Sequence, residues 1–146
     1  MSDEFFSDLD KKLKNQANKN EMGKSQDEKL LQKVKNITET VTPLLNDYKA
    51  KLSKRGITAK LSVYPAGFEF KMFYKDGGEH GIKLTRSVHS KKYLFIGIYT
   101  NDDGKKFASE GGGPNITKFS IDVFEKYLQN EINDYLYYAE RHRGIK

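Results

Sequence analysis

The alternation of apolar and polar residues between positions 57 and 109 predicts an antiparallel β-meander. Residues 57–64 and 68–75 each alternate with a period of two, as does 82–89, which is typical of strands with one apolar and one polar face. Residues 93–100 are apolar on both faces, which predicts a strand covered on both sides, and 105–109 form a weaker fifth segment. Asp76-Gly77-Gly78 and Asn101-Asp102-Asp103-Gly104 suit the hairpin turns, because these residues tolerate positive φ.

Helices are predicted on both sides of this meander. Apolar residues recur at spacings of three and four from Leu30 to Tyr48, after a capping-box pattern at Ser25 and before Gly56, which suits a helix end. Pro43 lies inside this stripe and predicts one kinked helix, or a second helix capped by Thr42; a dimeric coiled coil is the alternative. A C-terminal helix is expected from the N-cap Ser120 to about residue 141.

The N-terminal residues predict a further short helix. Residues 2–20 carry an amphipathic pattern with Phe5, Phe6, Leu9 and Leu13 on one stripe, and residues 14–24 are a polar run that reads as a linker. We therefore expect an α+β fold in which a meander of four to five strands packs against a long N-terminal helix and a C-terminal helix. Residues 1–24 would form the short helix and linker, and 25–146 a single domain.

The composition and the N-terminal residues indicate the cellular compartment of the protein. The 146 residues contain no cysteine, which excludes disulfides and thiolate chemistry. The acidic start lacks the features of a secretory signal, and no apolar run approaches the length that spans a bilayer, so we expect a cytoplasmic protein without a membrane partner.

Candidate chemistry is sparse. His80 and His89 lie about 30 Å apart on one predicted strand, so they cannot share a metal ion. The glycine-rich residues 110–115 lack the Gly-Lys-Ser/Thr of a phosphate-binding loop. No nucleophile stands in a recognisable context, and the sequence predicts no catalytic residue, no metal site, no cofactor and no enzyme.

The polar faces of the predicted strands mix cations with aromatic rings. The net charge is +6, and the candidate residues are Lys60, Tyr64, Lys71, Phe73, Lys75, Lys83 and His89, with Lys91 and Lys92 at a hairpin tip. Lysines hold phosphates and aromatic rings stack on bases, so this face predicts binding of single-stranded DNA or RNA. The order of elements over residues 57 to about 140 resembles that of PUR-repeat and whirly-type single-strand binders, which is a resemblance of fold.

Three other interpretations stay open. The aromatic surface, with the stripe Phe5, Phe6, Leu9 and Leu13, also suits a protein-interaction module, such as an inhibitor, immunity or adaptor protein, or a homodimer. The N-terminal helix could instead cover the aromatic sheet face as an ordinary second layer. The basic charge could also reflect a lysine-rich composition alone. The salt dependence of binding distinguishes a nucleic-acid partner from a protein partner, because phosphate binding weakens steeply with salt.

Overall fold

The structure, a computed structural model, describes residues 2–87, 92–110 and 113–146, except for the side chains of residues 2 and 17–26. It confirms an α+β fold built on an antiparallel sheet. The chain divides into two compact units, the first up to Gln32 and the second Lys33–Lys146. The sheet and the C-terminal helix belong to the second unit.

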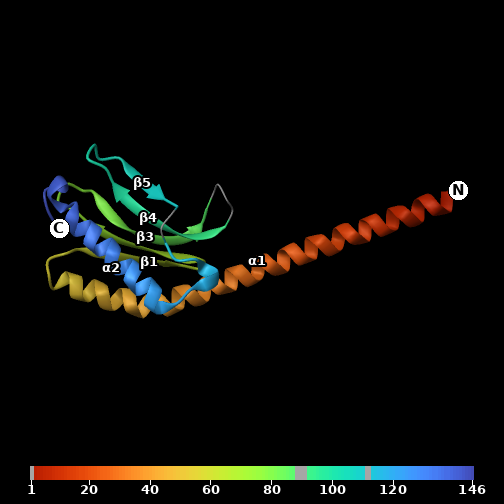
Figure 1. The fold of residues 1–146 in the computed structure, drawn as a ribbon, viewed down its shortest axis with the longest axis horizontal. Helices are drawn as coiled ribbons and strands as arrows, with labels where there is room; N and C mark the ends of the chain where they lie inside the picture. Colours follow the sequence, from red (N-terminus) through yellow and green to blue (C-terminus); the bar gives the residue numbers. More distant parts are fainter. Residues whose placement is uncertain (1, 88–91, 111–112) are drawn as a thin grey trace. The chain divides into compact units, whose positions relative to one another are not determined.

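The sheet is a meander in which each strand pairs with the next. Its strands are β1 (Ala59–Tyr64), β2 (Gly67–Phe73), β3 (Glu79–Arg86), β4 (Tyr93–Thr100) and β5 (Lys106–Ser109), in the order β1-β2-β3-β4-β5 (Figure 1). The predicted turns form as expected: Gly77 has φ +90° between β2 and β3, and Gly104 has φ +82° between β4 and β5. A side chain at either position would strain the backbone.

The register divides the strand residues between two faces. One face, which we call the helix-covered face, carries Phe68, Phe70 and Met72 of β2 opposite Leu84, Ile82 and His80 of β3. The other, the lysine face, carries the alternating residues. Its members are Lys60, Ser62, Tyr64, Glu69, Lys71, Phe73, Glu79, Gly81, Lys83, Thr85, Leu94, Ile96, Ile98, Thr100, Lys106 and Ala108.

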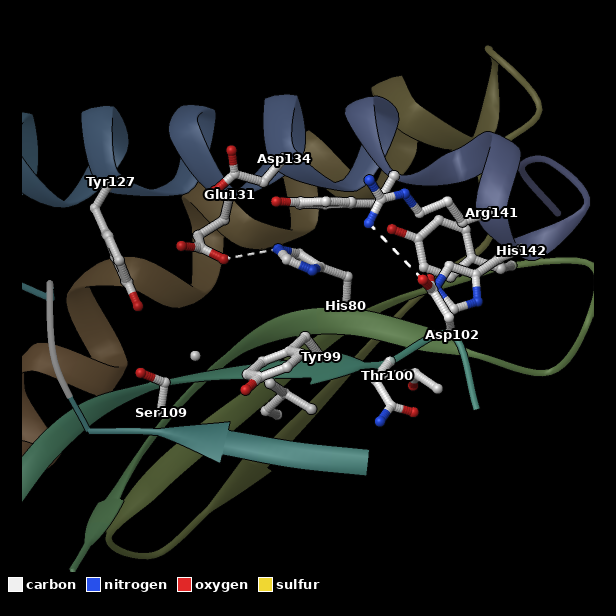
Figure 2. A pocket seen from close by; sticks show the side chains of 15 residues that line it. His80, Tyr99, Thr100, Asp102, Ser109, Tyr127, Glu131, Asp134, Arg141 and His142 are labelled. Carbon is white, nitrogen blue, oxygen red and sulfur yellow. Dashed lines mark hydrogen bonds and ion pairs between the residues drawn. The ribbon is translucent and has the colours of Figure 1, made fainter. Parts of the chain in front are cut away.

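Helices cover the first face. The helix α1 (Ser2–Ser53) contributes its residues from Lys33 onward, and α2 (Ile121–Tyr137) lies beside them; Gln129 donates a 2.9 Å hydrogen bond to the Tyr48 hydroxyl (Figures 1 and 2). Phe124 of α2 packs on the rings of Phe68 and Phe95. The fully buried core accordingly joins these helices to the sheet; it includes Val34, Val41, Leu45, Phe68, Phe70, Met72, Ile82, Phe124 and Leu128.

The predicted start of α2 is confirmed in detail. The Ser120 side chain accepts a hydrogen bond from the Val123 N–H, and the rings of Phe119 and Phe124 lie 6.2 Å apart as a hydrophobic staple. The helix ends at Tyr137, and a short 3₁₀ turn, η2 (Ala139–His142), continues toward the C-terminus. A second 3₁₀ turn, η1 (Ile116–Lys118), precedes α2.

The structure differs from the sequence prediction along α1. Residues 14–24, expected as a linker because they lack an apolar stripe, are helical, as is the region of the expected cap at Ser25. Most residues of this segment are Lys, Gln, Ala, Glu or Met, which have high helix propensities and offset the less favourable Asn15, Asn18, Asn20 and Gly23, and no proline interrupts it. The helix also continues through Pro43. Beside it, the hydroxyls of Thr38 and Thr42 donate to the carbonyls four residues earlier, Val34 and Thr38.

Among the described residues, no helix is both long enough and apolar enough to cross a membrane.

Candidate functional site

The register brings five of the predicted binding residues onto the lysine face. Lys60 lies directly opposite Lys71, and Glu69 lies between Ser62 and Lys83. Tyr64 and Phe73 belong to the same face, and the register places them about six residues apart along the strands, or roughly 20 Å. Within the described part of the unit Lys33–Lys146, the helices lie on the other face of the sheet (Figure 1). The lysine face therefore has an aromatic ring near each end and cations between them.

One of these lysines is held by carboxylates. The Lys71 ammonium lies 2.6 Å from Glu69 and 3.1 Å from Glu79, and Lys106 approaches Glu79 from the other side at 3.4 Å. Burial lowers the pKa of Lys71, but its hydrogen bonds to Glu69 and Glu79 outweigh this and hold the pKa above its ordinary value. Glu79 itself is buried, so it needs these cations. Lys71 is thus a charged but partly neutralised group.

Lys60 and Lys83 differ from Lys71. Within the described residues, neither has an ion-pair partner. Lys60 is exposed and lies directly opposite Lys71, whose charge Glu69 and Glu79 partly neutralise. Tyr64 is 51% exposed and Phe73 is half-buried. On the lysine face, Lys60 and Lys83 thus supply cations without an ion-pair partner among the described residues, and Tyr64 and Phe73 supply accessible rings.

The remaining predicted residues lie elsewhere. Lys75 is exposed in the turn after β2, where its backbone N–H donates to Gly144. Lys92 is exposed just before β4, and its carbonyl accepts from the Ser87 N–H. His89 and Lys91 fall outside the described residues. Lys106, which the sequence analysis did not single out, joins the lysine face instead.

The predicted partner-binding stripe is exposed. Phe5 and Phe6 are 64% and 57% accessible, and Leu9 and Leu13 are also exposed. The rings of Phe5 and Phe6 contact each other edge to face, with centroids 5.4 Å apart. Large apolar side chains grouped in this way on one helix are typical of a surface that meets another molecule.

A cavity of about 440 Å³ lies on the helix-covered face, between α2 and η2 on one side and β3, β4 and β5 on the other (Figure 2). Gly97 contributes to its floor; a Cβ built there would meet no atom within 4 Å. Tyr99 stacks on Phe107 at 5.4 Å, and both rings remain partly exposed. The volume is in the range of small-molecule sites.

Titratable groups from distant parts of the chain meet at this cavity. His80 of β3 and Glu131 of α2 are joined by a 2.9 Å hydrogen bond between Nε2 and Oε2 (Figure 2). One ligand atom from each of His80, Glu131 and Asp134 lies within 4.8 Å of the other two. We call these three residues the His80 cluster.

Other groups at the cavity wall set its electrostatics. Burial raises the pKa of the Tyr127 hydroxyl, and the Glu131 carboxylate raises it further, so Tyr127 stays a neutral hydrogen-bonding group. Arg141 and Asp102 form a loose ion pair at 3.9 Å across the other end of the cavity (Figure 2). His142 also lines the cavity, but its Nδ1 is engaged by Asp76 at 2.8 Å.

Sequence reasoning missed the His80 cluster. His80 lies on the same face of β3 as Ile82 and Leu84. The alternation of the strand could therefore have indicated that His80 faces the helices. Glu131 and Asp134 stand three residues apart and so share one side of α2. Nothing in the sequence pairs this side of α2 with β3.

Comparison with known proteins adds no candidate function. No protein-family model, no curated protein and no solved structure matches the chain. The resemblance in element order to single-strand binders gains no support from these comparisons.

Proposed function

We propose that this chain is a non-catalytic, cytoplasmic binding protein that holds single-stranded DNA or RNA on the lysine face. The observation that carries the proposal is the grouping of Lys60 and Lys83, which have no carboxylate partner among the described residues, with the accessible rings of Tyr64 and Phe73. Single strands are bound by such combinations, in which cations follow the backbone and bases stack on aromatic rings.

The geometry favours an unpaired strand over a duplex. Stacking requires bases that are free to leave their neighbours, and the roughly 20 Å between Tyr64 and Phe73 leaves room for lysine contacts to the phosphates between two stacked bases. The carboxylates of Glu69 and Glu79 keep Lys71 in place at the centre of the face. A bound phosphate would also offset the repulsion that remains between Lys60 and the partly neutralised Lys71.

Fluorescence anisotropy of labelled single-stranded DNA and RNA tests the proposal. If Lys60, Lys71 and Lys83 each contact one phosphate, log affinity should fall with log salt with a slope near −2. Affinity should then fall roughly 20-fold between about 50 and 200 mM salt. Phe73→Ala and Tyr64→Ala should each weaken binding by about 5-fold or more. Tyr137→Ala, which removes an exposed ring from α2, is the matched control and should leave affinity unchanged.

No binding at low salt, or binding that Phe73→Ala and Tyr64→Ala do not alter, would remove the lysine face as the site. Comparing the DNA and RNA oligonucleotides shows which of the two the protein prefers.

A protein partner is the second candidate, because the stripe Phe5, Phe6, Leu9 and Leu13 is exposed. An amphipathic helix of this kind binds in an apolar groove, either on another protein or on a second copy of this chain. Sedimentation equilibrium distinguishes the homodimer, which should persist at high salt and be lost in Phe5→Ser/Phe6→Ser. A monomer at all concentrations would exclude self-association.

A further inference from the structure

The His80 cluster brings one imidazole and two carboxylates together at the cavity wall, on the face of the sheet opposite the lysine face. The Nε2 of His80 and the Oε2 of Glu131 are 2.9 Å apart, which matches neighbouring ligands at 90° on an octahedral ion and is about 0.4 Å shorter than on a tetrahedral ion. The ligand atom of Asp134 lies within 4.8 Å of both. The Asp134 oxygen can lie opposite only one of these two ligands, at about 4.2 Å, and must come closer to the other, so the exposed Asp134 side chain has to move by up to about 2 Å.

We propose that His80, Glu131 and Asp134 bind a divalent transition-metal ion at the wall of the cavity. One imidazole and two carboxylates form a ligand set that suits Zn²⁺ and also Mn²⁺ or Fe²⁺. Glu131 and Asp134 come from one side of α2, and His80 comes from the facing strand β3, so the ion would be bound between two elements already packed together. The His80 and Glu131 side chains are only 10% and 19% exposed, which holds the two ligands in place.

The surroundings are compatible with a cation. The two carboxylates outnumber the one imidazole, and the neighbouring Tyr127 adds a neutral hydroxyl. Arg141, which also lines the cavity, faces Asp102 at 3.9 Å. With three protein ligands, the ion keeps at least one coordination position toward the cavity, where a water molecule or a small anionic ligand could bind.

The experiment is metal titration of the full chain after removal of metals with a chelator. Zn²⁺ and Mn²⁺ are titrated by calorimetry, and Co²⁺ by its visible absorption. We expect one ion per chain. Glu131→Gln and Asp134→Asn should each weaken binding by more than about 100-fold, since even loss of a group behind the ligands costs 10- to 100-fold. Asp102→Asn removes a carboxylate from the same cavity but not from the cluster, and should leave the affinity unchanged.

Nitrogen NMR of His80 distinguishes a metal ligand from a purely structural hydrogen-bond partner. Added Zn²⁺ should shift the Nε2 resonance in the first case and leave it unchanged in the second. Asp134 is exposed, so Asp134→Asn should fold normally even if substitution of His80 or Glu131 does not. The absence of uptake of all three ions would overturn the proposal, as would uptake that survives both Glu131→Gln and Asp134→Asn. The contact between His80 and Glu131 would then serve only to join α2 to β3.

Discussion

Tyr74 and Tyr135 stack with ring centroids 4.5 Å apart, and each hydroxyl donates to a carbonyl on the other side of the interface. The Tyr74 hydroxyl donates to Tyr135 at 2.9 Å, and the Tyr135 hydroxyl donates to Phe73 at 2.5 Å. Burial raises the pKa of both phenols, so both remain neutral donors at physiological pH. This reciprocal pair fixes α2 to the end of β2, next to the cavity.

We expect Tyr135→Phe to lower the free energy of unfolding by about 1–2 kcal/mol, because the Phe73 carbonyl loses its donor while the ring stays in place. Urea unfolding measures the change. Tyr137→Phe removes the hydroxyl of a ring that is 74% exposed and should cost close to nothing. Equal effects of the two substitutions would show that the hydrogen bond to Phe73 contributes no stability.

Gly97→Ala should stabilise the protein by about 0.5–1 kcal/mol. Glycine in a strand loses more backbone entropy on folding than alanine, and a Cβ at this position meets no atom within 4 Å. Gly113→Ala is the contrasting variant, because its Cβ would lie 2.7 Å from the Cβ of Phe95 and should destabilise the fold. Thermal unfolding of both variants checks the prediction, and destabilisation by Gly97→Ala would mean that the space at this position is filled.

Asp76 should make stability depend on pH in the acidic range. Burial raises its pKa, but the hydrogen bond from the Gly78 N–H and the contact with His142 outweigh this and hold the pKa below its ordinary value of 3.8. A lowered folded-state pKa stabilises the protein above the unfolded-state pKa, and this contribution is lost as pH falls through the folded-state value.

The advantage of the wild type over Asp76→Asn should therefore be about 1 kcal/mol near pH 5 and decrease below about pH 4. Urea unfolding at a series of pH values measures it. An advantage that grows toward low pH would contradict the assigned direction of the shift.

The sheet was predictable from the sequence because its signals are local. The period of two assigns Lys60, Lys71 and Lys83 to one face, and the turn glycines Gly77 and Gly104 adopt the positive φ that the hairpins require. The cap at Ser120 was equally readable. Each of these features depends on residues close together in the chain.

The continuity of α1 and the His80 cluster were not predictable in the same way. The polar residues 14–24 carry no apolar stripe, so only helix propensity indicated their conformation. His80 and Glu131 are 51 residues apart, and their contact depends on how α2 packs across β3. The ion pair between Lys71 and Glu79 was not predictable either, because the register of β2 and β3 is what brings the two side chains together.

If the lysine face binds a single strand, Lys60→Gln should reduce the steepness of the salt dependence. Loss of one phosphate contact lowers the slope of log affinity against log salt by about 0.7. Lys126→Gln makes the same substitution at an exposed position of α2 and should leave the slope unaltered. Anisotropy titrations over a range of salt concentrations provide the slopes, and identical changes in the two variants would point to a non-specific effect of net charge.

The most direct test of the proposed function is an amide NMR titration of the labelled protein with a short single-stranded oligonucleotide. We predict chemical-shift changes concentrated on β1, β2 and β3 at Lys60, Tyr64, Phe73 and Lys83, with α2 unaffected on its exposed side. The absence of shifts at low salt, or shifts confined to α2 and the cavity, would contradict single-strand binding by the lysine face.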